Sequence, residues 1–193
     1  VIIGCELYVA EDYKRTRFTK EQPDCRFQQV LFAKNKAGYH NLAKLSTEAN
    51  TVGLYGQYAR VGRELIAQYR ENLIATTGGL QGEVPQLILQ VGERQAEEAF
   101  KWWLDVFGDD FYVELLRHGL PENDRVNRTL LSFAEKYGVR YIAQNNTFYA
   151  SREDSNAHDI LLCIRDGEVQ SKPIGRGRDC RFGFPNDEFY FKS

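Results

Sequence analysis

A glycine-rich segment at residues 72–89, with the sequence NLIATTGGLQGEVPQLIL, limits the folds open to this chain more than any other feature. A β-rich run at 73–77 meets Gly78 and Gly79, and an apolar periodic segment begins at Pro85. Glycine adopts backbone conformations that other residues resist, and proline is tolerated in the first turn of a helix. The segment therefore predicts a strand, a tight turn and a helix. In α/β proteins, ligands and catalytic groups collect at such turns.

This turn does not match the common phosphate-binding patterns. The run TTGGLQGE lacks the Gly-Lys-Ser/Thr ending of a P-loop, and it is not a GxGxxG motif. Because unrelated folds reuse such turns, the residues alone favour a structural role.

Strand-like and helical patterns alternate along the chain, which predicts an α/β fold with parallel strands in a layer or a barrel. Strands are expected at 1–10, 25–34, 73–77, 111–117 and 139–143. Helices are expected at 39–49, 61–69, 85–89, 93–107, 121–137 and 154–166. Helix 93–107 has the clearest apolar face, formed by Ala96, Phe100, Trp103 and Phe107. The segments 11–24 and 50–59 are expected to be loops, and 168–193 a loop-rich tail.

Length and charge narrow the class of protein. With 193 residues, 42% of them apolar, the chain can bury a large core, so one domain over 1–193 is expected. The net charge of −2 gives no basic excess of the kind that a duplex-binding surface shows. No apolar run approaches the roughly 20 residues of a membrane helix, and the sequence shows no signal-peptide pattern. We expect a soluble, cytoplasmic protein with no membrane partner.

The four cysteines, Cys5, Cys25, Cys163 and Cys180, are widely spaced and form no CxxC pair. This spacing favours structural thiols over a disulfide framework or a zinc site. The sequence starts on Val1 and contains no methionine, which predicts a piece of a longer protein.

Few residues suggest metal binding or catalysis. Of the histidines, His118 is the best placed, because it follows the expected strand 111–117, whereas His40 and His158 lie in helices. For each histidine a hydrogen-bonded structural role is favoured over a ligand role. Glu6 is a lone acid in an apolar strand, and it either points into a barrel mouth or needs a partner. No Ser-His-Asp or Cys-His arrangement is apparent, so the residues alone indicate a soluble α/β domain.

Several stretches resemble, in order, the PHP (polymerase and histidinol phosphatase) domain of the bacterial DNA polymerase III alpha subunit. They are IIGCELYV, VLFAKNKAGYHNLAKLSTEA, GLQGEVPQLIL, FGDDFYVELLRHG and GVRYIAQNNTFYASREDSNAHDILLCI. The second stretch resembles the family signature LAKN..GY.NL..L.S.A and is the most specific. The resemblance implies a TIM-like, distorted (β/α)7 barrel, here a partial barrel that lacks its first strands. The tail 168–193 would then lead toward the polymerase region.

The family holds divalent metals at the barrel mouth, and this chain departs from its ligand set. Glu6 matches the family's glutamate, but Gln28 replaces a histidine and Gly79 replaces a cysteine. Asn146 and Phe148 stand where the family has an aspartate and a histidine. Amides are weak ligands, and glycine and phenylalanine offer no side-chain donor. The resemblance thus implies a degenerate site with no catalytic residue, metal or cofactor, in which Gln28 and Asn146 are expected to donate hydrogen bonds to Glu6.

The resemblance also implies a role in DNA replication. The parent would be a DNA-directed DNA polymerase, a nucleotidyltransferase, and this piece would be a structural and interaction module that is not itself catalytic. Its partners would be the remainder of the alpha subunit and, as in some family members, the proofreading exonuclease subunit, with DNA reached only through the parent polymerase. The Phe/Tyr-rich tail and the Trp102–Trp103 region are candidate contact surfaces, with Trp103 expected in the core.

Two other functions remain open at this point. A surviving metal-dependent phosphoesterase or 3′–5′ exonuclease would use Glu6, with His118 as a nearby polar group. An unrelated small-molecule α/β enzyme requires that the match to LAKN and GYHNL be coincidental.

Overall fold

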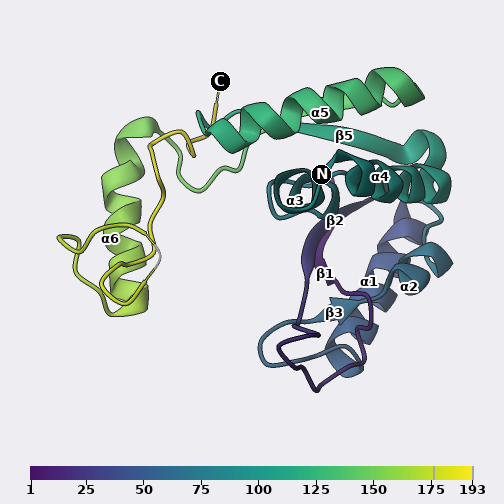
Figure 1. The fold of residues 1–193 in the computed structure, drawn as a ribbon, viewed down its shortest axis with the longest axis horizontal. Coiled ribbons are helices and arrows are strands. Elements are labelled where there is room, and N and C mark those ends of the chain that lie inside the picture. The colour runs from purple at the N-terminus through teal and green to yellow at the C-terminus, as the bar shows by residue number, and fades with distance from the viewer. Residues whose placement is uncertain (176, 193) are drawn as a thin grey trace. The chain divides into compact units, whose positions relative to one another are not determined.

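A computed structural model of the chain describes residues 1–175 and 177–192 (Figure 1). The chain forms two compact units. The first comprises Val1–Leu115 and Asp124–Ile142, and the second comprises Leu116–Asn123 and the chain from Ala143 onward. The single domain expected over 1–193 stays a prediction.

The predicted alternation of strands and helices is confirmed, with one short strand added. The strands are β1 (Gly4–Val9), β2 (Phe27–Ala33), β3 (Arg60–Val61), β4 (Leu73–Thr76), β5 (Phe111–Leu116) and β6 (Tyr141–Gln144). The helices are α1 (Lys36–Thr51), α2 (Arg63–Gln68), α3 (Glu83–Gln90), α4 (Glu93–Phe107), α5 (Pro121–Tyr137) and α6 (Ser155–Asp166). Short 3-10 turns, η1 (Gly108–Asp110) and η2 (Arg152–Asp154), precede β5 and α6.

The strands form one mixed sheet in the order β3-β1-β2-β4-β5-β6. β1 pairs in parallel with β3, and β4 with β5, but β2 is antiparallel to both β1 and β4. The expectation of parallel pairing is therefore wrong for β2. The connection from β1 to β2 contains no helix, whereas parallel neighbours are usually joined by a helical crossover. This α/β architecture is consistent with a fragment of a (β/α) barrel, and the barrel itself stays a prediction.

The helix expected at 61–69 begins later than the sequence pattern indicates. Val61 is completely buried and pairs with Val9 of β1. Gly62 then precedes α2 as its N-cap residue, with an extended backbone. Tertiary pairing therefore converts the first residues of the expected helix into a strand.

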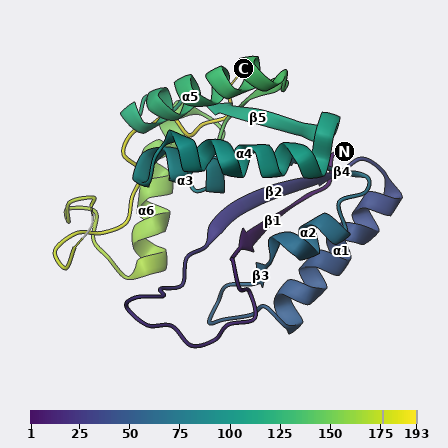
Figure 2. The same ribbon diagram turned by 45° about the vertical axis from the view of Figure 1, so that its right-hand side comes forward.

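The core of the first unit is built from buried side chains of strands β1 to β5 and of helices α1 to α5. Leu7, Leu31 and Val113 contribute from the strands, and each is at most 4% exposed. Phe100 of α4 packs its ring 5.2 Å from that of Phe111 and 5.4 Å from that of Phe133, centroid to centroid. Figure 2 shows α3 and α4 on one side of β1 and β2, with α1 and α2 on the other side in that view. The apolar face predicted for α4 is confirmed, because its four members are buried.

The glycine-rich segment forms the strand, turn and helix that it predicts, as β4 and α3. Gly78 has a φ of 72°, in the left-handed region that favours glycine. At Gly82, an added Cβ atom would lie 2.4 Å from the carbonyl oxygen of Thr77, closer than atoms can approach. The turn therefore needs glycine for two different reasons, conformation at Gly78 and space at Gly82.

In the second unit, α6 is followed by the C-cap residue Gly167, whose φ of 67° is left-handed. The chain that follows, yellow in Figure 1, returns along α6. Arg181 in this segment forms two hydrogen bonds with the carboxylate of Asp159, at 2.6 and 2.9 Å. Within the described part of the chain, no helix is long and apolar enough to cross a membrane.

Candidate functional site

Glu6 and Gln28 lie on the same face of the β1–β2 pair, opposite the face that carries Leu7 and Leu31. Glu6 is paired with Val30, and Tyr8 is paired with Gln28. Directly opposed residues share a face of an antiparallel pair, so Glu6 and Gln28 are diagonal neighbours. Their strand neighbours that point to the core, such as Leu7 and Leu31, are buried, whereas Glu6 is exposed. The structure thus places these two predicted site residues side by side on the open face of the sheet.

The expectation that Gln28 donates a hydrogen bond to Glu6 is wrong. Within residues 1–175 and 177–192, the carboxylate of Glu6 accepts no hydrogen bond from the side chain of Gln28. The backbone N–H of Gln28 instead donates to the carbonyl of Gln81, at 2.9 Å. Water can solvate an exposed carboxylate, so Glu6 needs no protein partner to offset a desolvation cost.

Gly79 lies in the turn that follows β4, at the carboxyl end of that strand. Its carbonyl oxygen accepts a hydrogen bond of 2.8 Å from the N–H of Gly82, which closes the turn. The position is half-buried and supplies only backbone atoms. Gly79 can therefore shape the turn, but it provides no side-chain ligand.

A buried carboxyl group lies beside this turn. Glu114 of β5 is 7% exposed, and its Oε2 accepts a hydrogen bond of 2.8 Å from the hydroxyl of Thr76. The same Thr76 oxygen accepts from the N–H of Gly78, at 3.2 Å. The N–H of Glu114 donates to the hydroxyl of Thr77, at 2.9 Å. These bonds tie the end of β4 and the interior of β5 to the start of the glycine turn.

Burial raises the pKa of Glu114 above its ordinary value, and the hydrogen bond from Thr76 only partly offsets this effect. A carboxyl group without a cationic partner is destabilised as an anion when it is buried. Sequence reasoning did not single out Glu114, although it is a lone acid in the apolar run FYVELL, the same signal that identified Glu6. The structure separates the two acids, since Glu6 is exposed and Glu114 is buried.

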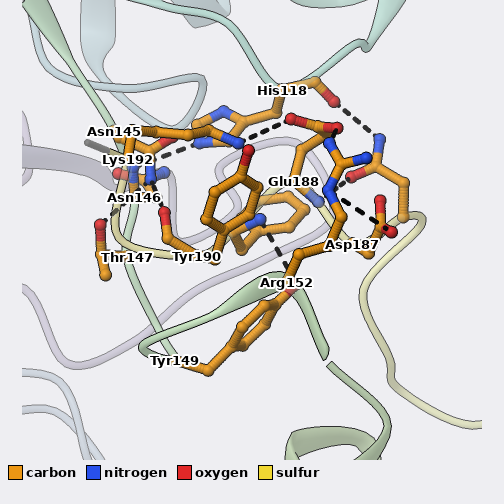
Figure 3. A network of polar contacts seen from close by, with 12 residues as sticks. His118, Asn145, Asn146, Thr147, Tyr149, Arg152, Asp187, Glu188, Tyr190 and Lys192 are labelled. Atoms are coloured by element: carbon orange, nitrogen blue, oxygen red, sulfur yellow. Dashed lines mark hydrogen bonds and ion pairs between the residues drawn. The ribbon is translucent and has the colours of Figure 1, made fainter. Parts of the chain in front are cut away.

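His118, in the second unit, is held by hydrogen bonds and by stacking (Figure 3). Its side chain is 2% exposed, and its Nε2 accepts a hydrogen bond of 3.2 Å from the backbone N–H of Asn146. The imidazole stacks on Phe189, with centroids 4.5 Å apart and planes 8° apart. Asn186 donates to the carbonyl of His118, at 2.7 Å. His118 thus joins three segments of the second unit.

The pKa of His118 lies below its ordinary value, first because of burial and then because of the nearby cation Lys192. A hydrogen bond with Asn145 and the charge of Glu188 act in the opposite direction without cancelling the decrease. An Nε2 that accepts a hydrogen bond must be unprotonated, so geometry and environment both favour the neutral imidazole.

Asn146 and Phe148 follow β6 in the second unit, close to His118. Asn146 contacts His118 through its backbone N–H. Phe148 is 55% exposed and packs edge-on against Phe184, with centroids 4.7 Å apart. Its backbone N–H donates to the carbonyl of Phe189, at 2.9 Å. The structure therefore brings His118, Asn146 and Phe148 together as one packed region of the second unit.

The side chains at the predicted site positions form a poor set of metal donors. Glu6 supplies one exposed carboxylate, and Gln28 and Asn146 supply neutral amides. Within residues 1–175 and 177–192, no group of three or more His, Cys, Asp or Glu is arranged to hold a metal ion. Divalent clusters use anionic or imidazole ligands, so this donor set does not fit the metals that the resemblance implies.

The two tryptophans of α4 differ in exposure. Trp103 is 1% exposed, and its indole N–H donates to the carboxylate of Glu83, at 3.0 Å. The expectation that Trp103 belongs to the core is confirmed. Trp102 is only partly buried, and the guanidinium of Arg63 lies 4.7 Å from its ring centroid. The role of the Trp102 region as a contact surface stays a prediction.

Comparison with known proteins identifies similarities over the whole chain. The family model described as "PHP domain" matches residues 1–118. The DNA polymerase III subunit alpha of Thermus aquaticus is 39% identical over 193 residues, which cover 100% of this chain and 15% of that protein.

Two further relatives give the same result. The DNA polymerase III subunit alpha of Treponema pallidum is 39% identical over 193 residues, with 100% of this chain and 16% of that protein covered. The DNA polymerase III subunit alpha of Borreliella burgdorferi is 37% identical over 195 residues, with 100% of this chain and 16% of that protein covered. The chain thus spans about one sixth of the length of these relatives.

Proposed function

Because this chain belongs to the PHP domain family and is similar throughout to DNA polymerase III alpha subunits, we propose that it is the PHP module of such a subunit. The longer protein would be a DNA-directed DNA polymerase that acts in DNA replication in the cytoplasm. The module would serve as a structural and interaction element with its metal site lost, and it would reach DNA only through the polymerase.

The donor set at the family's ligand positions is the observation that carries this proposal. Gln28, Gly79, Asn146 and Phe148 offer amides, a bare backbone and an apolar ring. The retained Glu6 would contribute a single carboxylate, which cannot assemble a multinuclear cluster. Neutral His118 already uses its Nε2 as an acceptor for Asn146, so it would have to break that bond to bind a metal.

Partners follow from the same proposal. The remainder of the alpha subunit would be the first partner, and docking of the proofreading exonuclease subunit would be a second role. Exposed aromatic side chains in the tail support an interaction role, since Phe182 is 54% and Phe191 is 70% exposed.

Metal binding tests the proposal directly. Equilibration of the protein with Zn²⁺ or Mn²⁺, followed by gel filtration and elemental analysis, should leave no stoichiometric metal. The Glu6→Gln variant should give the same result as the natural sequence. Stoichiometric metal that disappears in Glu6→Gln would instead support a metal-dependent phosphoesterase or 3′–5′ exonuclease.

A further inference from the structure

Helix α6 has apolar residues on two opposite sides. Leu162 and Cys163 are buried, at 8% and 6% exposed. Ile160, Leu161 and Ile164 lie on the other side and are 41%, 62% and 71% exposed. Residues three and four positions apart share a helix face, so these three side chains form one continuous stripe. A helix that is apolar on both sides is typical of a helix packed between two neighbours.

The stripe continues onto the chain that returns along α6. Arg165 lies one turn after Leu161, and its guanidinium is 5.4 Å from the ring centroid of Phe182. Phe182 is itself 54% exposed. Ile160, Leu161, Ile164 and Phe182 are named the α6 patch below. Arg165 borders the patch and is already paired with Asp166, at 2.6 Å.

The composition of the α6 patch indicates the chemistry of what covers it. No member is charged, and both acids of α6 are paired, Asp159 with Arg181 on the buried side and Asp166 with Arg165. An uncharged exposed patch of large side chains fits another apolar surface better than nucleic acid or an acidic or basic peptide.

The size of the α6 patch favours a tethered partner over a free one. A standard interface between separate proteins buries about 800 Å² on each partner. Four partly exposed side chains fall short of that area, so they offset little of the freedom that separate molecules lose on association. A surface in the same polypeptide binds at a high effective concentration, and a small patch is then sufficient. The relatives supply the length for such a partner, because this chain covers only 15–16% of the first two.

We propose that the α6 patch docks onto an apolar surface of another part of the same, longer polypeptide. This inference rests on the proposed function, since it takes the chain to be a module of a longer alpha subunit. It adds to that function the surface that holds the module in place.

Hydrogen exchange of the longer polypeptide, read by mass spectrometry, tests the inference. Ile164→Lys would place a charge in the docked patch, so the amides of α6 should exchange at least about fivefold faster than in the natural sequence. Val91→Lys is a matched control, because Val91 is 61% exposed and follows α3, outside the α6 patch. This control should leave the exchange of α6 unchanged. Equal exchange in all three proteins would overturn the inference.

Hydroxyl-radical footprinting of the natural longer polypeptide covers the case in which the lysine variant does not fold. Leu161 and Ile164 should oxidise several times more slowly than Val91, although their exposures here are similar. Oxidation at the same rate as Val91, or protection that grows with protein concentration, would overturn the inference, the latter because it indicates a second copy. Neither readout depends on metal binding, so stoichiometric metal at Glu6 could defeat the proposed loss of the metal site and leave the docking result intact.

Discussion

At the scale of single residues, His118 shows how a buried side chain couples stability to pH. Its imidazole is neutral, accepts a hydrogen bond from Asn146 and stacks on Phe189. The charged groups that face it are Lys192, which lowers its pKa, and Glu188, which raises it. Protonation would remove the acceptor and place a cation in a buried site near Lys192.

The sign of the pH effect follows from the lowered pKa of His118. The unfolded chain binds a proton at this residue near the ordinary pKa of about 6.5, whereas the native state resists it to lower pH. The contribution of neutral His118 to the free energy of unfolding is therefore complete above about pH 6.5. It is lost as the pH falls through the pKa of His118 in the folded state. We expect the urea concentration at the midpoint of unfolding of the second unit to decrease when the pH is lowered from 7.5 to 5.5. Circular dichroism measures this midpoint. His118→Gln keeps an acceptor for Asn146 and should flatten this decrease. His40→Gln, a control at an exposed position, should show the same decrease as the natural sequence. The prediction is contradicted if the midpoint of His118→Gln decreases with pH as steeply as that of the natural sequence.

Glu114 makes the stability of the first unit depend on pH in the opposite direction. Its raised pKa means that the native state keeps a proton that the unfolded chain releases near pH 4.5. Its contribution to stability is complete at low pH and is lost as the pH rises from that value through the folded pKa. Glu114→Gln should therefore abolish the loss of stability at rising pH. At pH 7 the variant should be as stable as the natural sequence or more stable. Glu114→Ala should destabilise by about 1–3 kcal/mol, because it leaves Thr76 without its acceptor. Denaturation of both variants at pH 5 and pH 7 measures these differences, and a Gln variant less stable than the Ala variant would refute the assignment.

At the scale of elements, the turn between β4 and α3 is fixed by close packing of its backbone. Gly82→Ala should destabilise the first unit more than Gly138→Ala, since its Cβ would lie 2.4 Å from the oxygen of Thr77. Gly138 has a φ of 67° with open space around it, so alanine there meets only the left-handed backbone penalty of about 1–2 kcal/mol. The free energies of urea unfolding compare the two variants. Equal losses would show that the turn can relax around a methyl group.

The elements also show what the sequence could predict. Helix α4 and the β4–α3 turn were predictable because periodic apolar residues and glycines report local structure. The antiparallel pairing of β2 and the strand β3 were not predicted, because they depend on partners distant in sequence. At the candidate site, the resemblance located Glu6, Gln28 and Gly79, but only the folded structure distinguishes exposed Glu6 from buried Glu114. A lone acid in an apolar strand gives the same signal in both cases.

At the scale of the whole molecule, the two compact units differ in how much apolar surface they bury. Among the described residues, the buried apolar side chains of the second unit are Leu116, Leu162, Cys163 and Phe189. The first unit holds the remaining buried apolar residues, including the aromatic cluster around Phe100. Because buried apolar area is the main source of stability, the second unit should be the less stable one.

This difference predicts that the 193-residue chain unfolds in two stages rather than one. Amides of α6 should lose protection from hydrogen exchange at a lower urea concentration than amides of α4, which packs in the larger core. The variants His118→Gln and Glu114→Gln show which unit unfolds in each stage, because His118 belongs to the second unit and Glu114 to the first. His118→Gln should alter the pH dependence of the first transition alone, and Glu114→Gln that of the second alone. Coincident loss of protection in α4 and α6, with both variants acting on one transition, would instead establish that the two units unfold as one cooperative body.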